Sequence, residues 1–350
     1  AGVESLLETT VVDAPEPGRL LVEESGRGRT VRYQHLVLAT GARERFLPYP
    51  GWTLPGVVGV GGAQALLKQG ARFHGLRVVV AGTGPLLLTV AAALAGDGAR
   101  VVGIAEQAPR GRLARFAPAL LRHPRKVAQG LGYALRLATV PYRTGRWVRA
   151  VEGDERVEQA VVTDGRRDRA WDCDVVACAY GLVPNLELAR LLGCQMHGEA
   201  LSLDEEQRTS VPEVFAAGEL GGIGGDGHAL VTGAIAGLRA ARRPVPEDLE
   251  RARDRERAFA AAYAAAFAPR DELKALATPE TVVCRCEDVS LGRLEPCRSA
   301  REAKLLTRAG MGPCQARVCG AALGLLKGWE PDSVRPPLDP VPLSVLEDME

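Results

Sequence analysis

The side chains with the most distinctive chemistry are four cysteines near the end of the 350-residue chain. One residue separates Cys284 from Cys286, four residues separate Cys314 from Cys319, and 27 residues lie between the two pairs. Each pair is close enough in sequence for two sulfurs to reach one centre, and glycines such as Gly312 flank the second pair. An iron–sulfur cluster needs four cysteine sulfurs in all. The spacing therefore predicts a metal centre, with a [2Fe–2S] cluster as the favoured occupant.

Two other uses of these cysteines remain open. A four-cysteine zinc site would employ the same residue type, although structural zinc sites more often have two to four residues between the ligands of each pair. A redox disulfide between Cys314 and Cys319 would leave the Cys284–Cys286 pair without a role. A one-residue gap favours a shared metal over an internal disulfide.

A second motif is a glycine turn between two hydrophobic runs. Residues 77–88 read Arg-Val-Val-Val-Ala-Gly-Thr-Gly-Pro-Leu-Leu-Leu, which predicts a strand that feeds a helix. Gly82 permits the tight bend, Gly84 lets the backbone approach a pyrophosphate, and Pro85 is tolerated in the first helical turn. The next predicted strand ends at Glu106, whose carboxylate would accept hydrogen bonds from ribose hydroxyls, which favours NAD over NADP. The predicted dinucleotide-binding residues are Gly82, Gly84, Pro85 and Glu106.

This fingerprint is incomplete, because Leu87 stands where a third glycine is expected. The alternative is a loop that keeps the Rossmann shape but binds no reducing pyridine nucleotide, or that holds another adenine nucleotide. The sequence therefore predicts a dinucleotide-binding unit and leaves its nucleotide open.

Two further strand–turn segments lie on either side of this unit. Residues 36–45 form a predicted buried strand with a glycine turn, and residues 214–219 lead through a glycine-rich stretch into a helix predicted over 228–241. Both segments resemble FAD-binding segments of two-dinucleotide-binding-domain flavoproteins. The resemblance implies that FAD contacts Thr40, Gly41, Ala42, Gly218, Glu219 and His228.

The cysteine segments carry a more specific resemblance. Residues 283–288 (Val-Cys-Arg-Cys-Glu-Asp) and 304–319 are similar to the [2Fe–2S] domain of the bacterioferritin-associated-ferredoxin type. The variant with four residues between the last two cysteines is typical of subunits of opine oxidases, hydroxyproline dehydrogenases and hydrogen cyanide synthase. Glu219, in place of the more usual Asp, fits the same branch. The resemblance implies that Cys284, Cys286, Cys314 and Cys319 are the ligands, and Cys297 matches none of them.

This resemblance implies a function. The chain is expected to be the electron-transfer subunit of a multisubunit flavin-dependent amine or amino-acid dehydrogenase, an oxidoreductase acting on CH–NH donors. Its expected cofactors are the cluster, FAD and NAD(P) or another adenine nucleotide. Its expected partners are a D-amino-acid-oxidase-like catalytic subunit together with a small ferredoxin-like one. The alternatives are an NAD(P)H-dependent FAD/[2Fe–2S] oxidoreductase acting alone and a non-enzymatic redox or assembly module. No acid/base or nucleophile constellation is identified.

The expected fold class is α/β, a glutathione-reductase-like flavoprotein with a small helical [2Fe–2S] domain. Residues 1–60 and 196–243 are expected to form a partial FAD-binding domain around a Rossmann domain at 61–195. Linker helices follow at 244–277, the cluster domain at 278–330 and a proline-rich tail at 331–350. The family begins FAD binding with a strand–GxGxxG–helix unit, and none precedes Thr40. The flavoprotein is therefore expected to be N-terminally incomplete, or to take its first unit from another polypeptide.

Bulk composition excludes several classes. The 44 basic and 43 acidic residues leave no nucleic-acid footprint. Eight cysteines with a metal-like set of four suit a reducing compartment, here the cytoplasm. Residues 78–96 carry no charge, but the Gly82–Pro85 turn favours strand, turn and helix over a membrane span.

Three further cysteines are interpreted as core residues. They are Cys173 and Cys178, both expected on one strand at 171–179, and Cys194.

Overall fold

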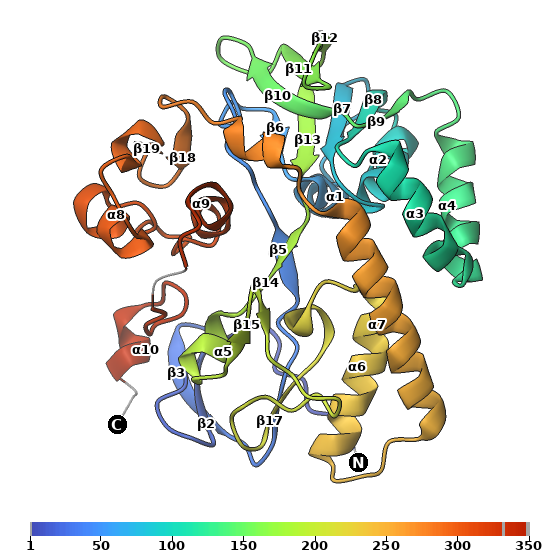
Figure 1. Cartoon of the computed structure of the whole chain (residues 1–350). Coiled ribbons are helices and arrows are strands. Elements are labelled where there is room, and N and C mark those ends of the chain that lie inside the picture. The colour runs from blue at the N-terminus through green and yellow to red at the C-terminus, as the bar shows by residue number, and fades with distance from the viewer. Residues whose placement is uncertain (1, 331–332, 348–350) are drawn as a thin grey trace. The chain divides into compact units, whose positions relative to one another are not determined.

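The computed structural model describes residues 2–330 and 333–347. The described chain divides into two compact units, one formed by residues 2–43, 184–260 and 333–347, the other by 44–183 and 261–330. The chain therefore passes from one unit to the other near residues 43 and 183, whereas the sequence predicted the corresponding domain boundaries near residues 60 and 195. Strands β5 (Ala42–Glu44) and β14 (Leu182–Pro184) pair with each other at these two crossing points. Helix α7 (Glu247–Phe267) begins in the first unit and ends in the second (Figure 1).

The first unit contains an antiparallel three-stranded sheet and a parallel pair of strands. The antiparallel sheet has the order β1-β2-β3 (Thr9–Asp13, Arg19–Glu24 and Arg27–Arg32). The parallel pair is β4 (Leu36–Leu38) with β17 (Val214–Ala216). The remaining elements are α5 (Glu187–Leu191), β15 (Met196–His197), β16 (Ala200–Leu201), η1 (Gly218–Gly221), α6 (Gly225–Ala240) and α10 (Leu343–Glu347).

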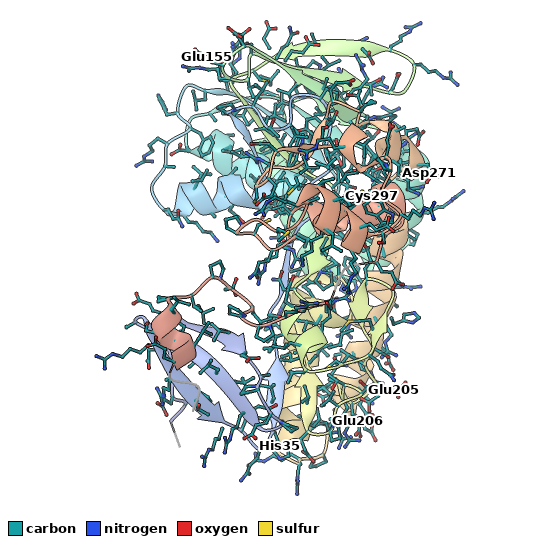
Figure 2. The ribbon with its side chains drawn as sticks, turned by 90° about the vertical axis from the view of Figure 1, so that its left-hand side faces the viewer. His35, Glu155, Glu205, Glu206, Asp271 and Cys297 are labelled. Carbon is teal, nitrogen blue, oxygen red and sulfur yellow. The ribbon has the colours of Figure 1, made fainter. Side chains whose placement is uncertain are left out.

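A loop between β16 and β17 carries acidic residues that tie it to nearby helices. Glu206 forms ion pairs with Arg208 at 2.7 Å and with Arg239 of α6 at 2.6 Å. Figure 2 labels Glu206 and its neighbour Glu205. His35 stands just before β4 and pairs with Glu213, just before β17, at 2.5 Å. The contact between His35 and Glu213 links the starts of the two parallel strands.

The second unit is built around a five-stranded sheet of order β6-β13-β7-β8-β9. All its pairings are parallel, and its strands are β6 (Val57–Val58), β7 (Arg77–Gly82), β8 (Arg100–Glu106), β9 (Tyr142–Thr144) and β13 (Val175–Ala179). The helices of this part are α1 (Val60–Lys68), α2 (Leu86–Gly96), α3 (Arg110–Leu121) and α4 (Pro124–Arg136). An antiparallel sheet of order β10-β11-β12 (Trp147–Glu152, Gln159–Thr163 and Asp168–Asp172) completes it.

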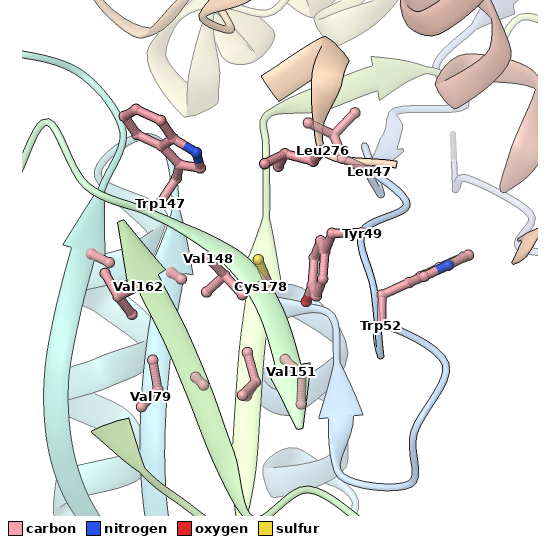
Figure 3. Close-up of a cluster of buried hydrophobic side chains, with 14 of the residues drawn as sticks. Leu47, Tyr49, Trp52, Val79, Trp147, Val148, Val151, Val162, Cys178 and Leu276 are labelled. Carbon is pink, nitrogen blue, oxygen red and sulfur yellow. The ribbon is translucent and has the colours of Figure 1, made fainter. Parts of the chain in front are cut away.

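Alternate residues of the central strands face two separate cores. Val78 and Val80 of β7 pack in one hydrophobic cluster with residues of α1 and α2. Val79 lies in the other cluster, with Trp147, Val148 and Val162 of the antiparallel sheet (Figure 3). Because successive strand residues point to opposite faces, an all-apolar run such as Val78–Ala81 is needed to fill both cores.

The C-terminal part of the second unit is small and mostly helical. After α7 come η2 (Asp271–Ala275), the hairpin β18 (Val282–Cys284) and β19 (Val289–Ser290), η3 (Gly292–Leu294), α8 (Ala300–Thr307) and α9 (Cys319–Lys327). Its core contains Val283, Val289 and Leu323, together with three of the cysteines. The hairpin docks through Trp52, whose Nε1 donates to the Val282 carbonyl oxygen at 2.5 Å.

The structure confirms the predicted α/β fold and the strand–turn–helix at 77–88. Cys173, Cys178 and Cys194 are buried, as expected of core residues. One detail is wrong, because Cys173 lies between β12 and β13 instead of sharing a strand with Cys178. No helix in the described ranges is both long and apolar enough to cross a bilayer. Residues 331–332 and 348–350 of the expected tail lie outside the described residues.

Candidate metal and nucleotide sites

The four predicted metal ligands come from a hairpin and from the loop that leads into α9. Cys284 ends β18, Cys286 lies in the turn towards β19, and Cys319 opens α9, with Cys314 in the preceding loop. Cys284 and Cys319 are 1% and 2% exposed, whereas Cys286 is exposed. The structure therefore places two of the sulfurs in a buried core and leaves one at the surface.

The thiols meet as two pairs. The Cys319 thiol hydrogen-bonds with the Cys284 sulfur, and Cys286 hydrogen-bonds with Cys314. The hydrogen bond with Cys319, opposed by burial and assisted by the backbone N–H of Gly310, lowers the pKa of Cys284 to about 6. The same partner, Cys284, and burial raise the pKa of Cys319.

Backbone N–H groups also point at these sulfurs. The N–H of Gly310 donates to Cys284 Sγ at 3.5 Å, and the N–H of Cys314 donates to the Cys286 sulfur. Such donors stabilise thiolate charge, and hydrogen bonds to sulfur are one of the means by which proteins tune iron–sulfur clusters. These donors favour negative charge on the two sulfurs that they contact, but the pKa of Cys284 is lowered, whereas those of Cys286 and Cys319 are raised.

The loop that carries Cys314 has an unusual backbone. Gln315 and Ala316 both have positive φ, 47° and 64°, a region that non-glycine residues seldom occupy. A Cβ on Gly312 would lie 2.2 Å from the Cβ of Cys286, so only glycine allows the loop to approach the hairpin this closely. Strained backbone of this kind concentrates at functional sites.

No three His, Cys, Asp or Glu side chains in the described residues gather as ligands of a single metal ion. The described thiols therefore lie as two hydrogen-bonded pairs. Cys297, labelled in Figure 2, is buried in the core of this small domain and belongs to neither pair.

A cavity of about 400 Å³ adjoins the cysteine hairpin. Apolar side chains such as Phe46 and Leu66 line it together with Arg285, which stands between Cys284 and Cys286 in the sequence. The Arg285 guanidinium lies 5.3 Å from the ring centroid of Trp52. A group bound in this cavity would therefore lie beside the residue that separates two candidate ligands.

The predicted flavin residues follow the two parallel strands of the first unit. Thr40 and Gly41 come after β4, and Gly218 and Glu219 come after β17. Because the strands are parallel, both segments leave the sheet at its carboxyl edge, which is where open α/β sheets bind nucleotides. The structure therefore brings these predicted residues to one edge.

Asn185 fixes the first of these segments, a role that the sequence did not identify. Its Nδ2 donates to the Thr40 carbonyl oxygen at 2.8 Å, and Thr40 Oγ1 donates to the Asn185 carbonyl oxygen at 2.6 Å. Its Oδ1 accepts from Arg43 at 2.7 Å. The signal was the Val-Pro-Asn sequence at 183–185, but its contacts join residues 145 positions apart, which a sequence motif does not reveal.

Glu219 holds the glycine-rich turn that starts α6. Its carboxylate accepts the backbone N–H groups of Gly224 at 2.7 Å and Gly225 at 3.0 Å. His228 lies in the first turns of α6, and its Nδ1 is buried without a hydrogen-bond partner among the described residues. Burial lowers the pKa of His228, which favours the neutral ring. An unpaired buried nitrogen at a helix N-terminus is the polar atom that a bound flavin could satisfy.

The glycine loop between β7 and α2 makes the tight bend at Gly82 that the sequence predicted. Gly82 ends β7 with φ 133°, and a Cβ there would lie 1.7 Å from the Ala179 carbonyl oxygen. Pro85 directly precedes α2, and Leu87 is buried in the core behind the loop. Sheet packing thus demands glycine at the first position, and the third position is filled by an apolar side chain.

Glu106 turns into the protein at the end of β8 and is completely buried. Its carboxylate accepts from the Gly84 N–H at 2.7 Å, the Thr83 hydroxyl at 2.8 Å and the Ala108 N–H at 2.8 Å. Burial outweighs these hydrogen bonds and raises the pKa of Glu106 to about 7. Glu106 was predicted to accept hydrogen bonds from a ribose. In the structure both of its carboxylate oxygens instead accept hydrogen bonds from the protein itself.

Residues 1–241 match the description "Pyridine nucleotide-disulphide oxidoreductase". The chain belongs to this family. It is 34% identical to hydrogen cyanide synthase subunit HcnB of Pseudomonas aeruginosa, over 99% of this chain and 83% of that protein. It is also 34% identical to an opine oxidase subunit of Rhizobium meliloti, over 100% of this chain and 83% of that protein.

A solved structure shares the fold. The L-proline dehydrogenase from P. horikoshii superposes with a TM-score of 0.66 at 19% identity, covering 97% of this chain and 64% of that one. Membership of the pyridine nucleotide-disulphide oxidoreductase family makes this chain an oxidoreductase. The family supports binding of FAD and NAD(P), and the two relatives are both named as subunits.

Proposed function

We propose that this chain is the electron-transfer subunit of a multisubunit flavin-dependent amine or amino-acid dehydrogenase, and that it passes electrons from a partner through FAD to a [2Fe–2S] cluster. The observation that supports the proposal most is the paired arrangement of Cys284 with Cys319 and of Cys286 with Cys314. The relatives add support, since each is named as a subunit of a hydrogen cyanide synthase or an opine oxidase. An iron–sulfur cluster would let a two-electron flavin communicate with a one-electron acceptor.

The chain's own residues have distinct roles in this proposal. The four cysteines would hold the cluster, and the N–H groups of Gly310 and Cys314 would stabilise charge on the sulfurs. Burial of Cys284 and Cys319 would exclude water from one side of the centre. The exposed Cys286 would leave a surface through which a partner can approach.

At the flavin, we assign orientation to residues around β4 and β17. Asn185 would hold the Thr40 segment in place, Glu219 would hold the turn before α6, and His228 would offer its unpaired Nδ1 to the flavin. These residues bind and orient, and we assign no proton transfer to them. Oxidation of the C–N bond would take place on the partner.

The flavin site would also need a further strand. In the described residues β4 pairs with β17 alone, and Val37 in the middle of β4 is 36% exposed. Parallel sheets are normally buried on both faces and continue on both sides. We propose that a strand with its own glycine loop lies against β4 in the functional protein. Stoichiometric FAD on the isolated chain would speak against this requirement.

The proposed partners are a D-amino-acid-oxidase-like subunit together with a small ferredoxin-like one, and the proposed compartment is the cytoplasm. The eight cysteines are all free thiols in the structure, which suits a reducing compartment.

The decisive test is electron transfer from the partner. The complex is assembled with the chain or with its Cys314→Ala variant, and the amine is added without oxygen while flavin and cluster absorbance are followed. We expect both chromophores to bleach with the unmodified chain. The variant should assemble but lose the cluster signal, whereas the matched Cys297→Ala chain should behave as the unmodified one. Equal turnover with the Cys314→Ala variant would refute the electron-transfer role.

The second candidate is an NAD(P)H-dependent FAD/[2Fe–2S] oxidoreductase acting alone. The intact strand–glycine turn–helix at β7 and α2 favours it. Rapid mixing with NADH separates the two proposals, because fast flavin bleaching without any amine partner supports the second candidate only.

A further inference from the structure

The end of α7 covers the second glycine loop. The Tyr263 hydroxyl lies only 2.7 Å from the position that a Cβ on Gly84 would take. Gly84 is the residue whose missing side chain lets a pyrophosphate approach the loop in dinucleotide-binding proteins. A side chain of the same compact unit therefore stands on the surface that a pyrophosphate would need.

Hydrogen bonds hold the residues that follow Tyr263 against Gln107, directly after β8, and Arg112 of α3. Gln107 Nε2 donates to the carbonyl oxygens of Phe267 at 3.4 Å and Ala268 at 3.2 Å. The Ala268 carbonyl oxygen also accepts from Arg112 Nη1 at 2.8 Å. Gln107 is completely buried, so its hydrogen bond to Phe267 is shielded from water.

Aromatic rings close the same contact. Tyr263 and Phe267 lie 4.8 Å apart between ring centroids. Phe116 of α3 meets Phe267 edge-on at 5.5 Å and Tyr263 at 6.3 Å. Phe116 and Phe267 are 6% and 9% exposed, which makes the contact a packed core and not a loose surface touch.

A backbone donor that would receive a pyrophosphate is also engaged. The Gly84 N–H donates to Glu106, and Pro85 has no N–H to offer. Anion binding at such a loop depends on free backbone N–H groups at the helix N-terminus. The observed conformation therefore does not fit a bound dinucleotide at this loop.

We propose that residues 263–268 close the second dinucleotide site, so that NADH binds there only when this segment is displaced. The inference rests on the proposed function, in which electrons enter from an amine-oxidising partner and not from a pyridine nucleotide. A closed site would prevent NADH from reducing the relay. The apparent dissociation constant of a ligand rises by the inverse of the fraction of protein in the open form.

The test measures NADH binding to the full chain by nicotinamide fluorescence and by calorimetry, without reference to turnover. The Tyr263→Ala/Phe267→Ala variant should bind at least about tenfold more tightly than the unmodified chain, because it releases the closed form. Tyr133→Ala removes a partly buried tyrosine that packs on the core around α2 and β7 and does not belong to the aromatic contact of Phe116, Tyr263 and Phe267, so it should leave binding unchanged. Circular dichroism verifies folding of each variant.

Should the double variant fail to fold, the single Tyr263→Ala variant removes the group that lies over Gly84 and should still tighten binding. Binding of NADH that is equally tight in the unmodified chain and in the opened variants would overturn the proposal, as would no gain in a folded variant. Iron content is measured on the same samples. A chain without iron would contradict the proposed electron-transfer role, and this outcome would not alter the result for NADH binding.

Discussion

Glu106 is the residue in which sequence pattern and structure differ most. Its place at the end of β8 was predictable from the length of the strand–helix–strand unit. Its hydrogen bonds to Gly84 and Thr83 were not, because they join residues 22 and 23 positions apart and depend on which way the side chain turns. The result is a buried carboxyl whose pKa is raised to about 7 by burial.

The raised pKa predicts a pH-dependent stability. Below pH 4.5 the carboxyl is protonated in the folded and unfolded states, and between 4.5 and about 7 only the folded state keeps the proton. The free energy of unfolding contributed by Glu106 should therefore fall as pH rises through this window, by on the order of 3 kcal/mol at most. Urea denaturation at pH 5 and pH 7 measures the change.

The comparison for this prediction is Glu106→Gln. The amide cannot titrate, so the variant should show a flatter dependence between pH 5 and 7, even though its NH₂ group faces a backbone donor and lowers stability throughout. Glu155→Gln alters an exposed carboxylate of the same unit (Figure 2) and should keep the original slope. An unchanged slope in Glu106→Gln would show that another group is responsible.

Gly312 gives a second prediction for a single residue. A Cβ there would overlap Cys286, so Gly312→Ala should lower the free energy of unfolding by about 1–3 kcal/mol and reduce iron occupancy. Gly320 lies in α9 with only an ordinary contact at 3.6 Å, and Gly320→Ala should be neutral or stabilising by about 0.5–1 kcal/mol. Chemical denaturation and iron analysis compare the two, and equal effects would remove the special role of Gly312.

Among the secondary-structure elements, α8 shows how the local sequence determines where a helix begins. Ser299 Oγ accepts the N–H of Glu302 at 3.1 Å, and Glu302 in turn accepts the N–H of Arg298 at 2.8 Å. This arrangement resembles a capping box, in which a serine and a glutamate three residues later satisfy donors at the start of a helix.

Removing this cap should weaken the small C-terminal domain. Ser299→Ala is expected to lower the free energy of unfolding by about 1 kcal/mol, because one helix donor loses its acceptor. Ser299→Asp keeps an acceptor at the N-cap and should differ from the original by a few tenths of a kcal/mol. Guanidinium denaturation measures both, and the prediction is wrong if the two variants lose the same stability.

Elements with a strong local pattern were predictable, and those without one were not. The Val78–Val80 run and its glycine turn predicted β7 and α2, because apolar period and turn chemistry act within a few residues. Cys173 was misplaced because β12 ends at Asp172 and β13 begins only at Val175, while Asp174 between them makes a long-range contact. Asp174 accepts from Arg77, 97 positions away.

For the whole molecule, the sequence identified the candidate cysteines but not the closing of the glycine loop. The four cysteine positions carry their own spacing, whereas the Gln107–Ala268 contact joins residues 161 positions apart. The observed boundaries between the two units also differ from the predicted ones. They lie at β5 and β14, two strands that are far apart in the sequence and pair with each other in the fold.

The family relationship connects the loop with the thiols. A chain related over nearly its full length to named oxidase and synthase subunits carries a closed second nucleotide loop and two pairs of thiols. In the proposed function the closed loop would keep NADH from reducing the flavin, and the thiols would hold the centre through which electrons leave. The proposal therefore depends on the thiols holding iron.

Iron and acid-labile sulfide in the chain purified without oxygen provide the sharpest check of that dependence. We expect about two irons and two sulfides per chain, the content of one [2Fe–2S] cluster. A colourless protein with neither, or a protein with one zinc ion per chain in their place, would refute the electron-transfer role.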